Sequence, residues 1–448
     1  MSKILSFGRT TTIFNCSLVA LLLSLFIASP LGVQQAHAEG FALYEWSARG
    51  VALSGALTAR TPDASAVAYN PALITRLKGT HIMGGLSTVT PRGTVRFTES
   101  NGNKDSAKPD TSTWYIPHFY MTTELSDRWT IGVGQFSRFG LGFSYNNNWP
   151  GRFAIYDVSL QTASVNPVIA WKATDNLSLA VGVEAQYLRL DMNKRGLAPI
   201  PSTPYSFEVD SDISGATNVG FGFNVAAHYQ ITDQWAIGAQ YRSAIKQRAE
   251  GENEFRLMDR RNVPAFITDD QLMNGFKDSD VRGTVIMPES VNVGLSYEPN
   301  EQWSFEANAI WTRWSSFRTL RIHFSEPQKS ARADSEVSES KKHWSDAWRL
   351  AFGAEYKPLD WLALRLGFAW DQSPMTEHYS DYLVPSDDRF SVSVGAGFKY
   401  DNWTLDLAYS MVDIQDRHWR ENPTTGTLKS RTKHAETHVA SMSFGYSF

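Results

Sequence analysis

The chain ends in Ala440-Ser441-Met442-Ser443-Phe444-Gly445-Tyr446-Ser447-Phe448, and this stretch decides the fold class. Apolar residues alternate in it with small or polar residues up to the last position, which is the period of a β-strand with two different faces. A transmembrane β-barrel requires such strands, because its outer face meets lipid and its inner face meets a lumen. Taken alone, one such segment fits a strand of a soluble β-sandwich better. Together with the secretory leader described below and the terminal Phe448, it favours an antiparallel transmembrane β-barrel.

Residues 362–370 and 403–411 repeat this alternation, and a short motif separates the expected strands. In the motif an Asp or Asn precedes the Trp or Leu that opens the next strand. It occurs at Asp127-Arg128-Trp129, Asp175-Asn176-Leu177, Asp233-Gln234-Trp235, Asn300-Glu301-Gln302-Trp303, Asp360-Trp361 and Asn402-Trp403. Asx residues favour tight turns, and Trp is typical of the level where a barrel meets lipid headgroups. Six such turns separate seven hairpins, which predicts about fourteen strands with short turns toward the periplasm and long loops toward the exterior.

The first 38 residues have the pattern of a secretory signal peptide. Lys3 and Arg9 precede an apolar run over residues 13–27, and the small-residue site Ala36-His37-Ala38 follows. The apolar run is too short for a transmembrane helix. We therefore expect the mature chain to begin at Glu39, and the only cysteine, Cys16, to be lost on processing, which leaves no disulfide.

The composition of the remaining chain fits an outer-membrane barrel. It holds no apolar stretch long enough to span a bilayer as a helix, but the full sequence contains 15 Trp, 17 Tyr and 25 Phe. Of its 42 basic residues, Lys3 and Arg9 lie in the expected signal peptide, which leaves 40 against 46 acidic residues. This mild acidic balance argues against nucleic-acid binding.

Residues 39–79 differ from the rest because they do not alternate. They are rich in Ala, Ser and Gly, as in Ala48-Arg49-Gly50-Val51-Ala52-Leu53-Ser54-Gly55-Ala56, and predict short helical turns and loops. A barrel of about fourteen strands is too wide to be filled by the side chains of its own wall. We therefore expect residues 39–79 to plug the lumen and residues 80–448 to form the barrel.

The start of the expected mature chain, Glu39-Gly40-Phe41-Ala42-Leu43-Tyr44-Glu45-Trp46-Ser47, resembles the hatch of the FadL family of long-chain fatty acid transporters. Asp63-Ala64-Ser65 and Asn70-Pro71-Ala72-Leu73-Ile74-Thr75 continue the resemblance within the hatch. Further matches follow along the whole chain at Ser137-Arg138-Phe139-Gly140-Leu141, Met287-Pro288-Glu289-Ser290, Trp314-Ser315-Ser316-Phe317, Asp346-Ala347-Trp348-Arg349 and Asp371-Gln372-Ser373-Pro374.

The resemblance implies a gated uptake channel. Gating residues would be Asn70, Pro71 and Ala72 of the hatch, which would line the ligand pocket through Phe41. Gly140 and Gly142 interrupt the third expected strand, where glycines allow a kink. In the family such a kink opens the barrel wall for lateral exit of the substrate; the alternative is an ordinary glycine at the end of a loop.

The strand expected from Leu177 carries the candidate ligand site. By parity Leu177, Leu179, Val181 and Val183 point to lipid, and Glu184, Gln186, Leu188, Leu190, Met192 and Lys194 point inward. The inward face thus changes from polar to apolar and ends in a cation, which suits the methylenes and the carboxylate of a fatty acid. The alternative is that Leu188, Leu190 and Met192 pack against the plug while Lys194 is a solvated loop charge.

The resemblance also implies two head-group cations. Lys194 matches the first, with Arg195 in its place if the register slips, and the second falls within Ser340-Lys341-Lys342, where we assign Lys341. Lys is a point charge without the fork of Arg, so carboxylate selection is weaker. Arg349 points inward by parity as well, and we expect it to form a structural ion pair.

No enzyme motif emerges, because the chain lacks G-x-S-x-G and H-E-x-x-H, although a dispersed hydrolase triad stays open. We expect no cofactor and no metal. The sequence thus favours a monomeric outer-membrane channel for long-chain fatty acids or related hydrophobic molecules, in contact with lipopolysaccharide and assembled by machinery that reads Phe448. Uptake of monoaromatic hydrocarbons, a general diffusion porin and an adhesive barrel are the alternatives.

Overall fold

The computed structural model describes residues 40–98, 102–110, 112–200, 203–260, 263–328, 335–376, 379–384, 387–422 and 426–448. The chain divides into two compact units, residues 1–36 and 37–448, and the second unit holds the barrel. The expected signal peptide and its cleavage before Glu39 lie outside the described residues.

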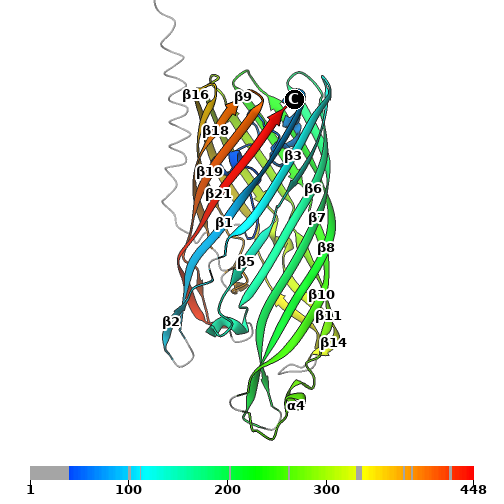
Figure 1. Ribbon diagram of the computed structural model, residues 1–448, viewed down its shortest axis with the longest axis vertical. Coiled ribbons are helices and arrows are strands. Elements are labelled where there is room, and N and C mark those ends of the chain that lie inside the picture. Colours follow the sequence, from blue (N-terminus) through cyan, green and yellow to red (C-terminus); the bar gives the residue numbers. More distant parts are fainter. Residues whose placement is uncertain are drawn as a thin grey trace, which may run out of the picture. The chain divides into compact units, whose positions relative to one another are not determined.

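Fourteen antiparallel strands close into a barrel in chain order, and the last strand pairs with the first (Figure 1). Nine are continuous: β1 (Thr80–Thr98), β3 (Trp114–Ser126), β6 (Asp157–Lys172), β7 (Leu177–Pro199), β8 (Ser206–Gln230), β17 (Leu362–Asp371), β18 (Arg389–Tyr400), β19 (Trp403–Ile414) and β21 (Lys429–Ser447). Five consist of two segments each: β4 (Trp129–Phe136) with β5 (Gly140–Ser144), β9 (Trp235–Arg242) with β10 (Ile245–Asp259), β12 (Ser290–Tyr297) with β11 (Ser279–Met287), β13 (Trp303–Thr312) with β14 (Thr319–Gln328), and β16 (Ala347–Leu359) with β15 (Ser335–Lys341). The short strands β2 (Lys104–Ala107) and β20 (His418–Trp419) extend the sheet beside β1 and β21. The prediction of about fourteen strands is confirmed.

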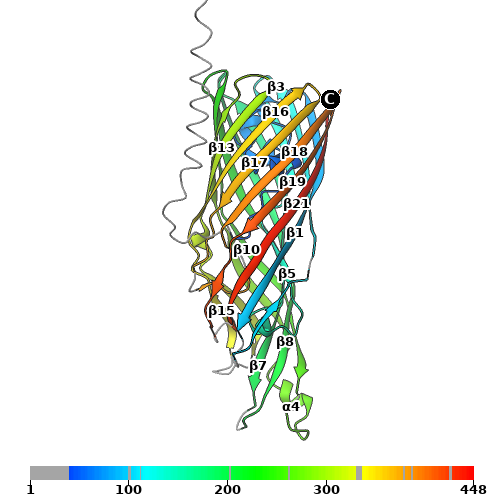
Figure 2. The same cartoon turned by 90° about the vertical axis from the view of Figure 1, so that its left-hand side faces the viewer.

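The six predicted turns join β3 to β4, β6 to β7, β8 to β9, β12 to β13, β16 to β17 and β18 to β19. They lie at the end of the barrel that also holds the C-terminus, which we call the short-turn end (Figures 1 and 2). At one of them Asp401 adopts φ 49°, a left-handed conformation that Asp tolerates better than most residues. The Asx residues thus explain why the chain reverses in so few residues.

The two faces of the wall follow the predicted parity. On β7 the side chains of Val181 and Val183 are 54% and 63% exposed, whereas Glu184 and Gln186 are buried inside. The last strand repeats the pattern, with Phe444 exposed on the outer face. None of the helices in the described part of the chain is both long and apolar enough to cross a membrane.

Residues 40–79, which we call the hatch, lie inside the barrel toward the short-turn end (Figure 1). They form the short helices α2 (Ala48–Ala52) and α3 (Ala66–Tyr69) and the 3₁₀ helix η1 (Pro71–Arg76). Helix α2 contacts β17, β18, β19 and β21, whereas η1 contacts β4, β6, β7 and β8. The hatch therefore reaches the wall on both sides of the lumen.

At the opposite, long-loop end, β7 and β8 project far beyond their neighbours, together with helix α4 (Asp269–Met273) (Figure 2). Two 3₁₀ turns, η2 (Pro150–Phe153) and η3 (Trp314–Ser316), lie in loops of the same half of the barrel. A small apolar cluster that includes Phe207, Val209 and Leu272 packs β8 against α4. The long loops are thus folded structures with a core of their own.

Candidate functional site

An apolar core fills the lumen between the hatch and the long loops. Leu188 and Met192 of β7 are buried in it, and Leu190 packs against it from a partly buried position. Between Leu190 and Met192 the pairing of β7 with β8 is irregular, so the strict alternation is disturbed there. The predicted apolar stretch on the inner face of β7 is therefore present.

Two lysine ammonium groups come together at the edge of this core. Lys194 is partly buried and interacts electrostatically with Lys342 and Asp381. Lys342 is 2% exposed, and its Nζ lies 2.5 Å from the Asp381 carboxylate. Two cations thus share one carboxylate, which leaves room for a second anion.

Lys194 lies beyond the membrane-facing part of its strand, since Tyr187 is the last exposed apolar residue before the exposed Arg189. Burial lowers the pKa of the Lys194 ammonium, and the neighbouring Lys342 lowers it further, while Asp381 acts in the opposite direction. A bound carboxylate would relieve both unfavourable effects.

Lys341, the residue assigned from the sequence, lies exposed on the outer wall, whereas Lys342 is buried beside Asp381 and is the better candidate for the second cation. Lys341 is the last residue of β15 and is exposed on its outer face. The chain then leaves the strand ladder, and the backbone N–H of Lys342 donates to the Arg318 carbonyl. Parity along β15 therefore does not extend to the residue that turns into the lumen.

Phe41 lies in the middle of an aromatic cluster at the start of the hatch. Its ring centroid is 4.8 Å from that of Trp314, 5.8 Å from Trp344, and 6.0 Å from both Phe139 and Phe317. We call these five residues the aromatic cluster. All of them are buried and belong to the lumen core that also contains Leu188 and Met192.

The third wall strand is broken where the hatch begins. β4 ends at Phe136 and β5 starts at Gly140, and the residues between them pair with the hatch instead. The N–H of Leu43 donates to the Arg138 carbonyl at 2.8 Å, and that of Gly140 donates to the Phe41 carbonyl at 3.0 Å. The predicted interruption of this strand is present, and the hatch occupies it.

The two glycines that follow the break meet close contacts of different kinds. A Cβ atom at Gly140 would lie 2.7 Å from Leu43 Cδ1 of the hatch, and one at Gly142 would lie 1.9 Å from Trp114 Cζ2 of β3. Real Cβ atoms do not approach other atoms so closely, so a side chain at Gly142 would have to displace the indole ring.

Asn70, Pro71 and Ala72 are fully buried and join the hatch to itself and to the wall. The Asn70 side chain accepts from the N–H of Ala72 and donates to the carbonyl of Thr58 at 2.7 Å and to that of Ala227 on β8 at 3.0 Å. Pro71 follows as the first residue of η1, where its missing N–H costs nothing. The motif is therefore a helix cap with an added anchor to the barrel.

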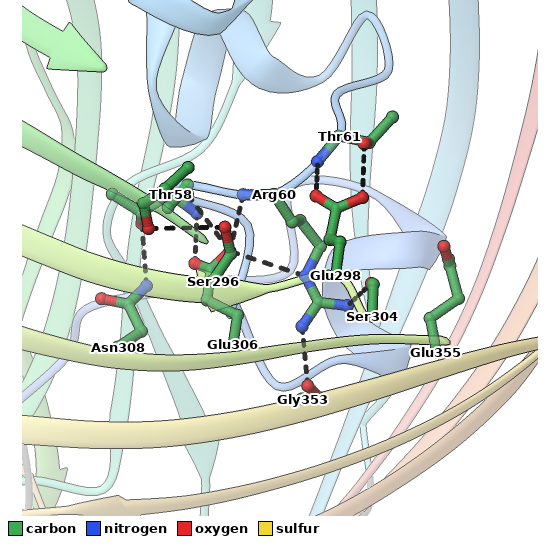
Figure 3. A network of polar contacts seen from close by, with 12 residues as sticks. Thr58, Arg60, Thr61, Ser296, Glu298, Ser304, Glu306, Asn308, Gly353 and Glu355 are labelled. Carbon is green, nitrogen blue, oxygen red and sulfur yellow. Dashed lines mark hydrogen bonds and ion pairs between the residues drawn. The ribbon is translucent and has the colours of Figure 1, made fainter. Parts of the chain in front are cut away.

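A network of polar contacts that the sequence analysis missed holds the next part of the hatch (Figure 3). The carboxylate of Glu306 on β13 accepts from the backbone N–H groups of Thr58, Ala59 and Arg60 at 2.6, 3.1 and 2.9 Å. The guanidinium of Arg60, fully buried, donates to Ser304 and to the Gly353 carbonyl. Thr61 donates twice to Glu298, as Figure 3 shows.

The alternation of β13 contained a signal for this network. Glu306 is an inward-facing polar residue between Phe305 and Ala307, in a strand whose outer face is apolar. An ionised group on the inner wall needs a partner, and the hatch supplies backbone N–H groups. The sequence does not give the backbone path of residues 58–60, so it could not identify their N–H groups as the partners of Glu306.

Arg349 forms the ion pair with Asp371 that the sequence analysis expected, and its guanidinium also donates to the Ser54 carbonyl of the hatch. The guanidinium carbon of Arg349 lies 4.4 Å from the centroid of the Tyr44 ring. A polar pocket between the hatch and β17, β18 and β19 includes this pair, together with Glu45 and Arg389. Among the described residues no group of three or more His, Cys, Asp or Glu could hold a metal ion.

Comparison with known proteins gives one consistent result. The model of a family described as outer membrane protein transport protein (OMPP1/FadL/TodX) matches residues 30–448. Outer membrane protein P1 of Haemophilus influenzae is 25% identical over 97% of this chain and 99% of its own. The long-chain fatty acid transport protein of Escherichia coli K12 is 24% identical over 89% of this chain and 93% of its own.

Solved structures show the same fold. A FadL homologue of Pseudomonas aeruginosa is similar with a TM-score of 0.80 at 20% identity, over 92% of this chain and 100% of that one. The toluene transporter TodX of Pseudomonas putida is similar with a TM-score of 0.66 at 20% identity, over 91% and 99% of the two chains.

Proposed function

Since the chain belongs to the OMPP1/FadL/TodX family of outer membrane transport proteins, we propose that it admits long-chain fatty acids and related hydrophobic molecules by passive uptake through its lumen. It is a transport protein and not an enzyme. The observation that carries the substrate class is the pair of ammonium groups, Lys194 and Lys342, which interact beside a buried apolar core, with one carboxylate, Asp381, paired to Lys342. A fatty acid offers a matching carboxylate and a matching chain.

The energetics of this site favour capture and make release the difficult step. Each buried methylene contributes about 0.8 kcal/mol, so a chain of about sixteen carbons gains on the order of 10 kcal/mol on leaving water. A charge-assisted hydrogen bond to the carboxylate adds about 1.5 to 3 kcal/mol. Release therefore needs a change in the protein that removes part of the pocket.

We infer that the hatch provides this change. Phe41 fills the centre of the aromatic cluster, and the same few residues pair with the break between β4 and β5. A shift of this segment would alter the pocket and uncover the break at once. The substrate would then leave sideways through the wall at Gly140 and would avoid water.

Uptake of monoaromatic hydrocarbons is the second candidate. The aromatic cluster supports it, because five aromatic side chains suit a small ring better than a flexible chain. Such a ligand has no charge, so the two lysines would contribute nothing to its binding. The packed lumen core argues against a general diffusion porin. Single-channel conductance distinguishes a porin from a transporter of hydrophobic molecules.

The orientation of the barrel, its oligomeric state and its contacts in the membrane are part of the same proposal. We place the short turns in the periplasm and the long loops outside, with the protein acting as a monomer. Phe448 is 70% exposed at the short-turn end, where assembly machinery could bind it. Lipopolysaccharide would surround the half of the wall nearer to the long loops.

Replacing Lys194 by Met tests the substrate class, because it keeps the length of the side chain and removes the charge. Palmitate binding to the purified barrel, measured by calorimetry, should weaken roughly ten- to a hundredfold, while toluene binding stays nearly unchanged. Lys341→Met is the matched control, since Lys341 is exposed outside the lumen, and it should alter neither.

Equal losses for both ligands in Lys194→Met would indicate collapse of the pocket. Unchanged palmitate affinity, together with tighter binding of toluene than of palmitate, would replace the fatty-acid proposal by the hydrocarbon one.

A further inference from the structure

Five cations lie side by side on the outer wall of the barrel, on the two-segment strands. They are exposed residues of β10, β11, β14 and β15, and we call them the basic belt: Lys246, Arg248, Arg282, Arg321 and Lys341. Their neighbours along the strands, such as Gln247 and Val281, are buried inside. The alternation of each strand thus turns these cations away from the lumen.

The belt is continuous across the pairing of these strands. Lys246 lies opposite Ile286, and Arg248 opposite Thr284. On the next pair of strands Lys341 lies opposite Thr319. The cations therefore form one surface and not isolated charges.

The belt begins where the lipid-facing residues end. Ile286, the strand partner of Lys246, is an exposed apolar residue, and so are Val293 and Leu295 further toward the short-turn end. On β8 the exposed Phe221 and Val219 reach up to the same region of the wall. The cations are thus placed at the level where acyl chains give way to headgroups.

The belt carries more positive charge than its carboxylates can neutralise. Arg321 pairs with Glu339 at 3.3 Å, and Glu250 lies opposite Arg282 on the neighbouring strand. Within the described part of the chain, no ion pair is formed by Lys246, Arg248 or Lys341. By contrast, Arg189 pairs with Asp191 on β7, and Arg256 pairs with Glu254 nearer to the long-loop end of β10.

The charge reverses further from the membrane. Beyond Arg248 the outward residues of β10 are Glu250, Glu252 and Glu254, and Asp280 lies opposite Glu252. The two signs overlap at the border, where Arg282 lies opposite Glu250, but Lys246, Arg248 and Lys341 lie on the membrane side of Glu250 and Glu339. The arrangement fits an anionic layer located just above the acyl chains.

We propose that the basic belt binds the phosphate groups of lipopolysaccharide in the outer leaflet. Lipopolysaccharide carries phosphates on the sugars directly above its acyl chains, which is the level of the belt. Arg and Lys bind phosphate through charge-assisted hydrogen bonds, and the exposed apolar residues below the belt contact the acyl chains. The proposal rests on the orientation given under the proposed function, with the long loops outside, and is independent of the substrate.

The triple variant Lys246→Gln, Arg248→Gln, Lys341→Gln tests it. These residues lie outside the lumen, so palmitate binding should be unchanged. Binding of fluorescent lipopolysaccharide to the purified, folded barrel should weaken about a hundredfold, since each cation near an anionic membrane surface is worth roughly fivefold in affinity. Dephosphorylated lipopolysaccharide should bind the unmodified protein as weakly as the intact lipid binds the variant.

The matched control is Lys172→Gln, Lys357→Gln, Lys399→Gln, which removes the same charge near the short-turn end. It should leave lipopolysaccharide binding unchanged. Equal binding to the belt variant and the unmodified protein would overturn the proposal, and so would equal binding of the dephosphorylated lipid. Displacement of the lipid by inorganic phosphate alone would instead identify a site for the free ion. Loss of palmitate binding in Lys194→Met bears only on the proposed function.

Discussion

Glu306 is the wall residue that holds residues 58–60 of the hatch. Its carboxylate accepts from three consecutive backbone N–H groups and lies 3.5 Å from the guanidinium of Arg60, with both side chains fully buried. A charge in such a place is stable only while its partners are present. This side chain therefore couples residues 58–60 of the hatch to the wall.

Glu306→Gln should release residues 58–60 from the wall. The amide nitrogen cannot accept a hydrogen bond, and Arg60 is left buried without its counter-charge, which typically costs about 3 to 5 kcal/mol. Hydrogen exchange read by mass spectrometry should be faster for the amides of residues 58–60 and unchanged in β13. Glu301→Gln, at an exposed turn, is the control, and protection equal to the unmodified protein in Glu306→Gln would contradict the role given to this residue.

At the residue scale the sequence identified the apolar inner face of β7, because a strand that faces lipid on one side fixes the direction of every second side chain. The role of Lys194 as the head-group cation stays a prediction. The sequence failed at Lys341, since the parity rule ends where β15 ends and the chain leaves the ladder. It also missed Glu306, whose partners are backbone atoms and carry no sequence signal.

Among the elements, the broken third strand distinguishes this wall from a simple barrel. Gly140 and Gly142, both in β5 after the break, allow Leu43 of the hatch and the indole ring of Trp114 to approach the backbone. Alternation predicts continuous strands well, because lipid and lumen impose it along the whole span. It says little about the hatch, whose small residues fit many backbone paths, and whose helices contact nine wall strands.

The two glycines should differ in their response to substitution. Gly142→Ala forces Trp114 to move, and overpacking of this kind typically costs about 1 to 3 kcal/mol. Uptake should fall, and Trp fluorescence should shift. Gly140→Ala meets only the flexible end of Leu43, so its effect on fluorescence should be small. An equal shift in both variants would show that Trp114 is not the critical contact.

On the scale of the whole molecule, closure joins β21 to β1 along most of their length. The six Asx turns were sufficient to count the strands, since every short turn implies one hairpin. Of the five strands with two segments, the sequence predicted an interruption only in the third, from its glycines. The inner volume is filled by residues of the hatch and by residues of the long loops.

The barrel should behave in solution as a closed unit that begins at Glu39. Without heating it should migrate faster in electrophoresis than after boiling, and mass spectrometry of the outer-membrane protein should give an N-terminus at Glu39. Retention of residues before Ala38 would contradict the predicted cleavage, and recovery of the protein in the soluble periplasmic fraction would contradict its place in the membrane.

The buried position of Gly40 limits what can be added at the start of the hatch. Its carbonyl accepts from Arg389 of the wall, and a Cβ atom added to it would lie 2.7 Å from Trp314 Cζ2 and 2.9 Å from Trp344 Cζ3, so the first described residue is enclosed by the wall and the aromatic cluster. We therefore expect an affinity tag fused directly before residue 40 to obstruct assembly, whereas one inserted at the tip of the β7–β8 hairpin would not.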